Sequence, residues 1–413
     1  MENKMINKFN EGDFFGSSSS PEGGYNPPPY SEAPRWDDFS LLDESMAKKR
    51  FSKFSLALFV YMVVSFALII AMQVAITFIF DEAKAEEILG NYTFLMIANF
   101  VAMYVIAFPI LYLMVRGMRS VRRTKTPMKI SEFFQIFLVA EAFMYAGNLV
   151  GSYLNMFIGG IFGVEIDNGV AEMIENTPMW LIIAMVVLVG PVVEELIFRK
   201  LFFDKLGHYG DRLIIFVSAI AFGIFHGNFY QLFYAVLVGL VLGYVYARTS
   251  NILYPIALHV MLNFLGSVIP MLLYDKIERF SELSEIMMSG GEVDPMELGQ
   301  LSLIVGAYSI VELAMVVAGT VIFFKKKNTI FVSDRCEVLI PKQRRVAVIL
   351  GNVGAILFVA LMAIMMASEI VLPIIEALNT PTLPTEPPAT DIAPGGNTDV
   401  GDALIWLIKS IAR

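Results

Sequence analysis

The chain has 413 residues, of which 56% are hydrophobic and only 17% charged, and it carries a net charge of -9. Its mean hydropathy of +0.65 is too high for a soluble globular protein. The single cysteine, Cys336, excludes an internal disulfide and a CxxC metal site.

Apolar runs of about 20 residues recur along the chain, and this length crosses the ~30 Å hydrocarbon layer of a membrane. The alternating pattern of an outer-membrane barrel is absent. The sequence therefore predicts an all-α, polytopic transmembrane helical bundle of eight or nine spans in a lipid bilayer. The expected ranges are 54–80, 92–115, 131–163, 179–205, 212–227, 229–247, 251–274, 302–324 and 346–371.

Polar segments flank these spans at both ends of the chain. The first 47 residues contain SSSSPEGG and NPPPY and have no apolar segment of signal-peptide type. We expect 1–47 to be a disordered cytoplasmic tail and 48–374 to be the transmembrane domain. Residues 375–413 are expected to form a Pro/Thr-rich tail that ends in a short amphipathic segment, ALIWLIKSIAR, at the membrane surface.

Charged residues divide the loops into a basic set and an acidic set. The basic set includes 116–129 and 342–345, whereas the acidic set includes 81–87, 164–178 and 275–300. Lysine and arginine favour the cytoplasmic side of a membrane. We therefore expect a cytoplasmic amino terminus and an extracytoplasmic carboxyl terminus.

Two adjacent carboxylates and an arginine follow an apolar run in GPVVEELIFRK, residues 190–200. Charge in a bilayer core costs several kcal/mol and is usually functional. Residues four apart share a helix face, so Glu195 and Arg199 are predicted to neutralise each other. Glu194 points elsewhere and has no partner on its own helix.

Two histidines also lie in apolar spans, His226 in AFGIFHGNF and His259 in ALHVMLNFLG. Helical spacing places Phe222 and His226 on one face, and His259 and Asn263 on another. At ~1.5 Å per residue from the predicted inner ends, Glu194 lies ~16 Å deep, His226 ~21 Å, His259 ~12 Å and Asn263 ~18 Å. These polar groups are therefore expected to share one layer of the membrane.

Such a layer can hydrolyse a peptide bond in two ways. A buried carboxylate can act as a base toward water, while histidine and asparagine side chains stabilise an oxyanion. Alternatively, Glu194, His226 and His259 could hold a divalent metal such as zinc, whose bound water would be the nucleophile. No HExxH motif is present, and the residues alone leave both routes open.

The same residues form three ordered motifs. EELIFR matches EExxxR, FGIFH matches FxxxH, and HVMLN matches HxxxN. Together they resemble the CAAX-protease and bacteriocin-processing (CPBP, Abi) family of intramembrane proteases, which includes Rce1-like prenyl endopeptidases. The resemblance places a protease-like core at about 178–272.

The resemblance implies a cavity open to the cytoplasm and hydrolysis of a membrane-associated peptide or protein. By the motif match, Glu194 is the expected general base, helped by His226, and His259 with Asn263 forms the oxyanion site. The second acid and the arginine of EExxxR would be the supporting pair. We favour the glutamate-dependent form, which requires no cofactor, over the metalloprotease.

A second hypothesis is a non-catalytic membrane scaffold or bacteriocin self-immunity protein with the same fold. A transporter would need internal repeats, and none is visible. Nothing in the sequence points to nucleic acid, and it leaves the oligomeric state open. Of the remaining polar residues, His208 is expected to be exposed in a charged loop, Glu141 is a lesser candidate for lining the cavity, and Glu312 a weaker one.

Overall fold

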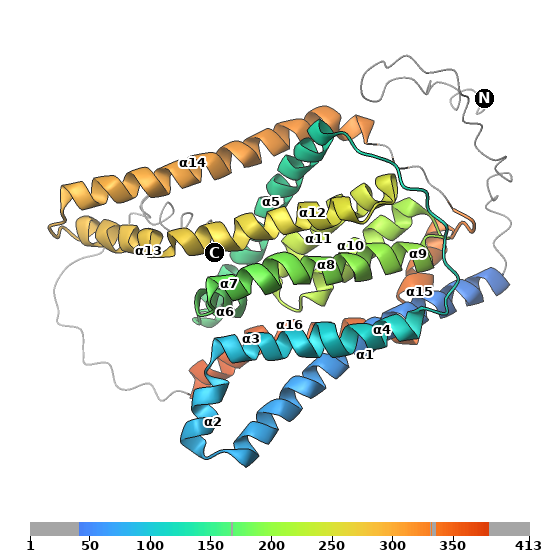
Figure 1. Cartoon of the computed structure of the whole chain (residues 1–413), viewed down its shortest axis with the longest axis horizontal. Coiled ribbons are helices and arrows are strands. Elements are labelled where there is room, and N and C mark those ends of the chain that lie inside the picture. Colours follow the sequence, from blue (N-terminus) through green and yellow to red (C-terminus); the bar gives the residue numbers. More distant parts are fainter. Residues whose placement is uncertain (1–40, 167, 331, 333–335, 380–413) are drawn as a thin grey trace.

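Helices dominate the computed structural model, which describes residues 41–166, 168–330, 332 and 336–379 (Figure 1). No β-strand occurs in these ranges, although Tyr209 and Cys336 form an isolated bridge. Eight helical segments are long and apolar enough to cross a membrane, which identifies a multi-pass membrane protein. They are Asp43–Ile79, Tyr92–Val115, Ile130–Phe162, Met179–Leu206, Phe229–Thr249, Leu253–Met288, Pro295–Lys326 and Val353–Ile375.

The amino-terminal spans form an antiparallel pair. The first helix, α1, begins at Leu41, earlier than the predicted end of the tail at residue 47. Its neighbour begins where the side chain of Asn91 accepts a hydrogen bond from the backbone of Phe94, an ordinary N-cap. The elements are α1 (Leu41–Ile79), α2 (Glu82–Leu89), α3 (Tyr92–Phe100), η2 (Val101–Ala107) and α4 (Phe108–Val115).

The central elements carry the polar residues of the three motifs in two spans and a hairpin. They are α5 (Ile130–Phe162), α6 (Gly169–Glu175), α7 (Met179–Ile182), η3 (Ile183–Val189), α8 (Gly190–Glu195), η4 (Leu196–Leu201), α9 (Phe202–Leu206), α10 (Asp211–Phe225), α11 (Phe229–Thr249), α12 (Leu253–Asn263) and η5 (Phe264–Val268).

Long helices complete the bundle. In Figure 1, α13 and α14 run beside each other, and α16 lies along α1. The predicted final span, 346–371, is divided in the structure into a short helix and a long one. The elements are α13 (Ile269–Met288), α14 (Pro295–Lys326), the turn η6 (Lys327–Thr329), α15 (Lys342–Ile349) and α16 (Val353–Asn379).

Wide, π-helical turns interrupt three of the spans. A proline follows three of the four π-helical segments, η2, η3 and η5, whereas η4 runs into α9 without one. Pro109, Pro191 and Pro270 are each the second residue of the α-helix that follows a π-helical segment. Proline has no N–H to donate to the preceding turn, and its ring clashes with the carbonyl four residues earlier. The preceding turn widens as a result, and such turns are frequent at functional sites.

The expected span 212–227 corresponds to a helix that is shorter than the other candidate spans. This helix is α10, which has only 15 residues and a length of ~22 Å, less than the ~30 Å hydrocarbon layer. A tight turn follows, in which Gly227 has φ +72° and Asn228 caps α11. Among the described residues, eight candidate spans agree with the expected eight or nine, and the remaining expected range is the shorter arm of a hairpin formed by α10 and α11.

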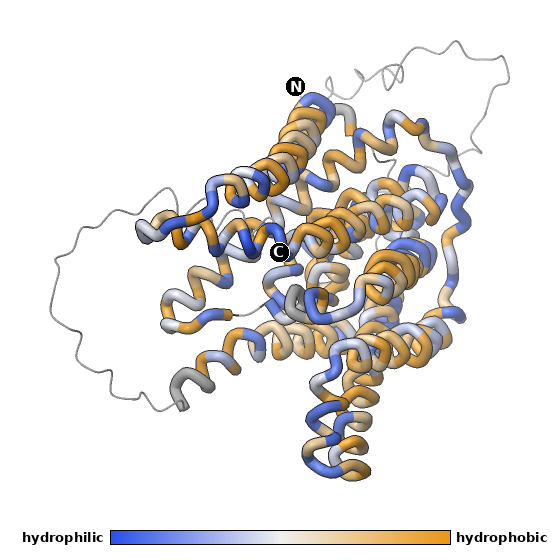
Figure 2. The backbone as a smooth tube through the Cα atoms, turned by 60° about the vertical axis from the view of Figure 1, so that its left-hand side comes forward, coloured by the Kyte–Doolittle hydropathy of each residue, from blue (hydrophilic) through white to orange (hydrophobic). Residues whose placement is uncertain are grey.

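Glycines allow the helices of the bundle to approach closely. A Cβ atom on Gly147 of α5 would collide with the backbone of Tyr234 on α11, and one on Gly319 of α14 would collide with the backbone of Leu138 on α5. Such contacts between small residues and backbone are typical of helix packing in membranes. Figure 2 shows apolar residues along the helices and hydrophilic residues gathered toward their ends and connections.

The basic loop 116–129 is bound tightly to one end of the bundle. The ammonium group of Lys205 donates hydrogen bonds to the carbonyl oxygens of Arg116 and Met118. His208, which the sequence suggested to be exposed, is only 2% exposed and pairs with Glu337 at 3.1 Å. The loops predicted to be cytoplasmic thus gather on a common face, whereas the side of the membrane on which that face lies stays a prediction.

Both predicted tails extend beyond the described residues. Residues 1–40 and 380–413, including the terminal segment ALIWLIKSIAR, lie outside them. At the inner boundaries, residues 41–47 and 375–379 are helical, so the helices extend further than the predicted domain limits.

Candidate active site

The supporting pair predicted from helix spacing is present and is completely buried. Arg199 Nη1 lies 3.0 Å from Glu195 Oε1, and both side chains have no exposed surface. The guanidinium group also stacks over the ring of Phe222, 4.5 Å from its centroid, and donates to the carbonyl of Gly239 at 3.4 Å. Burial makes this pair costly to break, because either charge alone would be left without compensation.

His259 connects this pair to Glu194. Its Nδ1 atom lies 3.0 Å from Glu195 Oε1, and its Nε2 atom lies 3.7 Å from Glu194 Oε2. The two carboxylates of the motif, which point in different directions from one helix, therefore face opposite edges of one imidazole. The sequence placed His259 in the same layer as Glu194, but it did not predict this contact with Glu195.

Glu194 is the most accessible acid of the cluster. Its side chain is 15% exposed, compared with 0% for that of Glu195. The hydroxyl of Tyr104 donates to Glu194 Oε1 at 3.4 Å. The prediction that Glu194 has no partner on its own helix is correct, but Tyr104 and His259 approach it from other spans.

The sequence predicted that His226 lies within a helix. In the structure it lies directly after α10, in the turn before α11. Its Nδ1 atom is 2.8 Å from the carbonyl oxygen of Phe222, and the two rings meet edge to face at 4.8 Å. The ring of His259 contacts the same Phe222, with centroids 5.7 Å apart. His226 also interacts electrostatically with Glu194, so the structure brings it into the cluster.

Asn263 lies one helical turn after His259, at the end of α12. Its side-chain amide donates to the carbonyl oxygen of Val186 in the π-helical segment η3 at 2.9 Å. This bond uses one of the two amide hydrogens and leaves the second for another acceptor. Asn263 therefore ties the HxxxN helix to the EExxxR helix beside the cluster.

Hydrogen bonding to carboxylate and carbonyl oxygens defines the roles that the two imidazoles can take. A neutral His259 that donates from Nδ1 to Glu195 presents Nε2 to Glu194 as an acceptor, whereas the protonated ring donates from both nitrogens. A neutral His226 that donates from Nδ1 to Phe222 likewise leaves Nε2 for a second contact. The cluster can therefore accept a proton from water and return it.

A metal site in the cluster would need its ligands to surround a common point. Glu194, His226 and His259 are the predicted ligands, and both rings have the second hydrogen bond typical of metal-bound histidines. However, among the described residues no three His, Cys, Asp or Glu side chains lie close enough together to hold an ion. In this arrangement the residues do not form a metal triad.

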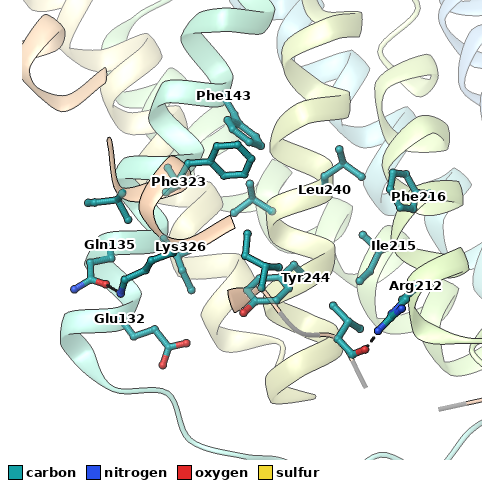
Figure 3. A pocket seen from close by; sticks show the side chains of 16 residues that line it. Glu132, Gln135, Phe143, Arg212, Ile215, Phe216, Leu240, Tyr244, Phe323 and Lys326 are labelled. Atoms are coloured by element: carbon teal, nitrogen blue, oxygen red, sulfur yellow. Dashed lines mark hydrogen bonds between the residues drawn. The ribbon is translucent and has the colours of Figure 1, made fainter. Parts of the chain in front are cut away.

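A large apolar cavity of the bundle is separate from this cluster. It has a volume of about 520 Å³ and lies between α5, α10, α11 and α14. In Figure 3 its apolar side chains include Phe143, Phe216 and Leu240, and Lys326 reaches Gln135 at one edge. None of the predicted site residues lines it, so its size alone does not mark the candidate active site.

A smaller cavity of about 120 Å³ adjoins the cluster, because Asn263 lines it. Glu141 and Glu312 line the same cavity, which fits the expectation that Glu141 faces a cavity and gives Glu312 a similar position. The opening of a cavity to the cytoplasm stays a prediction.

Tyr104 is the residue at the cluster that sequence reasoning missed. It is separated from Glu194 by 90 positions and lies in an apolar span with no motif around it. Only the packing of the second span against the fourth brings the two together. The one local signal was the proline that follows at position 109, which marks the widened turn η2 containing Tyr104.

Comparisons with known proteins agree with the motifs. Residues 176–265 match the model of the family described as "Type II CAAX prenyl endopeptidase Rce1-like". A segment of 125 residues is 32% identical to the "Putative membrane peptidase YdiL" of Bacillus subtilis (strain 168), covering 29% of this chain and 49% of that protein. The chain thus matches about half the length of this relative. No solved structure has significant similarity to the chain. The resemblance to the Rce1-like family is confirmed for this segment.

Proposed function

We propose that this protein is an intramembrane endopeptidase that hydrolyses a membrane-associated peptide or protein. The observation that carries the proposal is the arrangement of two carboxylates around one imidazole, in which Glu194 is accessible and Glu195 is buried with Arg199. The family match over 176–265 supports the same reaction class.

In the proposed reaction Glu194 takes a proton from a water molecule, and the water oxygen attacks the carbonyl carbon of the peptide bond. The carbonyl oxygen becomes an oxyanion, which accepts hydrogen bonds from the second amide hydrogen of Asn263 and from protonated His259. The proton held by Glu194 then passes to the departing amine, assisted by His226, and the C–N bond breaks. The products are a carboxylate and an amine.

Glu195 and Arg199 act as positioning residues in this scheme. The carboxylate of Glu195 fixes the ring of His259 through Nδ1, and the guanidinium group of Arg199 pairs with the same carboxylate. The buried pair thereby sets the direction in which Nε2 of His259 faces Glu194.

The test is hydrolysis of a fluorogenic transmembrane peptide by the purified protein in proteoliposomes. We expect turnover by the wild type and a loss of about 100-fold or more for Glu194→Gln, which keeps the shape but cannot accept the proton. The control is Glu282→Gln, which changes an exposed acid of α13. Equal hydrolysis by wild type and Glu194→Gln would reject Glu194 as the base, and no hydrolysis by the wild type would favour a non-catalytic scaffold or immunity role.

We also propose the glutamate-dependent form of the reaction, because the three candidate ligands are not gathered around a common point. Dialysis against a chelator is therefore expected to leave peptide hydrolysis within about twofold of its initial rate. Loss of activity on chelation, with recovery after addition of zinc, would contradict this form and favour the metalloprotease.

A further inference from the structure

The cavity beside Asn263 contains two acids and no base. Glu141 projects from α5 and Glu312 from α14, and the remaining lining residues are neutral. The volume of about 120 Å³ is large enough to hold several water molecules or a small group. This cavity lies outside the proposed base and supporting pair, and the reaction scheme assigns it no role.

Glu141 is buried without a hydrogen-bond donor. Its residue is only 2% exposed, and its Oε2 atom accepts no hydrogen bond from any residue that the structure describes. Glu312 is 8% exposed and accepts a hydrogen bond from the hydroxyl of Tyr308 at 3.4 Å. Glu141 also interacts electrostatically with Glu312.

Two carboxylates in this setting are complementary to a cation. Buried charges in proteins are normally paired, and intramembrane acids usually pair with another group or mark a substrate pathway. Here the cavity supplies acceptor oxygens from both acids and lacks a basic side chain of its own. A group that enters with a positive charge and hydrogen-bond donors would satisfy the buried Oε2 of Glu141.

The cavity adjoins the catalytic cluster, so a cation bound in it could be part of the proposed substrate. Asn263 lines the cavity and also belongs to the catalytic cluster, and the lining residue Tyr234 interacts electrostatically with Glu194. A side chain that extends into the cavity would therefore belong to a residue at or next to the bond that is cleaved.

We propose that this cavity is a specificity pocket for a lysine side chain of the substrate, whose ammonium group donates hydrogen bonds to Glu141 and Glu312. An ammonium group carries three donors on a flexible apolar stem, which fits a polar pocket reached through an apolar bundle. This inference rests on the proposed function, since it assigns the substrate class of the same site.

Binding tests the pocket without requiring hydrolysis. The measurement uses Glu194→Gln protein in micelles and two fluorescent transmembrane peptides that differ only in lysine or norleucine, scanned over the positions around the expected cleavage site. At one position the lysine peptide is expected to bind about tenfold or more tightly, as a charge-assisted hydrogen bond predicts. Adding Glu141→Gln or Glu312→Gln should remove this preference, whereas Glu369→Gln, outside the cavity, should keep it.

Equal binding of the lysine and norleucine peptides at every position would overturn the proposal, as would a preference that survives both cavity substitutions. If the wild type hydrolyses peptides, the same preference should appear in kcat/KM and disappear in Glu141→Gln, while hydrolysis of the norleucine peptide is retained. If the wild type hydrolyses no peptide, the proposed function is rejected. The binding comparison of the lysine and norleucine peptides still tests whether the cavity is a lysine pocket. A cavity that binds only a free inorganic cation would give equal peptide binding and count against the proposal.

Discussion

The carboxylate of Glu195 is the residue on which the candidate active site depends for its geometry. One oxygen atom, Oε1, contacts both Arg199 and His259 at 3.0 Å. The other, Oε2, is buried and accepts no hydrogen bond from the described residues. Glu195 therefore neutralises a buried cation and orients a histidine with a single atom.

Substitution of Glu195 separates these two contributions. Glu195→Gln leaves Arg199 buried without a counter-charge, which is expected to cost about 3–5 kcal/mol of stability. The double variant Glu195→Gln, Arg199→Met removes both charges and should recover much of that loss, because a buried ion pair is replaceable by apolar groups. Thermal unfolding in micelles measures both.

Hydrolysis should respond differently from stability. Because His259 loses its carboxylate partner in both variants, activity is expected to remain low in the double variant even where its unfolding temperature recovers. Recovery of activity together with stability would show that the pair serves folding alone, and the positioning role would then be rejected.

The sequence predicted contacts within one helix better than contacts between helices. The pair Glu195 and Arg199 follows from a spacing of four residues, and the structure contains it. The contact of Glu195 with His259 spans 64 positions, and that of Tyr104 with Glu194 spans 90. Such contacts depend on how spans pack, and helical periodicity carries no information about them.

At the scale of elements, close approach of α5 and α14 brings Glu141 and Glu312 together. Gly319 makes this possible, because a Cβ atom there would overlap the backbone at Leu138. Gly319→Ala is therefore expected to destabilise the protein by about 1–3 kcal/mol, as overpacking does. Thermal unfolding in micelles again gives the measurement.

A matched control lies on the same helix. Gly306 of α14 has no atom within 4 Å of an added Cβ, so Gly306→Ala should cause no loss of stability. Equal effects of the two substitutions would show that loss of glycine from α14, and not contact with α5, determines the result.

The element whose end the sequence misplaced is α10. Its apolar residues suggested a span over 212–227, but the helix ends at Phe225 and the chain turns at Gly227. Hydropathy measures the length of an apolar run without showing where a helix inside it ends. This early end places His226 in a turn, where the ring is held by the carbonyl of Phe222.

The predicted orientation of the whole molecule in the membrane follows from its loop charges. We expect the loop at 116–129 to face the cytoplasm and the loop at 289–294 to face the opposite side. Since Cys336 is the only cysteine, Cys336→Ser provides a background for single-cysteine variants. Lys125→Cys and Glu292→Cys place a thiol at an exposed position in each loop.

Labelling of intact cells with a membrane-impermeant maleimide reports the orientation. The thiol at position 292 should react, whereas the thiol at position 125 should react only after the membrane is permeabilised. The reverse pattern would contradict the predicted orientation of the entire bundle.

For the molecule as a whole, the sequence predicted the fold class and the family resemblance, but not how the helices pack against one another. Hydropathy predicted the all-helical membrane fold, and eight spanning helices confirm it. The three motifs indicated a resemblance to the Rce1-like family, and the family match over 176–265 confirms that resemblance. Neither signal describes how α5 and α14 meet, and the acidic cavity at that contact therefore became visible only in the structure.

The most direct test of the account is the rate at which Glu194→Gln hydrolyses a transmembrane peptide in proteoliposomes, relative to the wild type and to Glu282→Gln. We predict that the wild type and Glu282→Gln hydrolyse the peptide at similar rates, and that Glu194→Gln is at least about 100-fold slower with an unchanged unfolding temperature. Hydrolysis by Glu194→Gln at the wild-type rate would contradict the account.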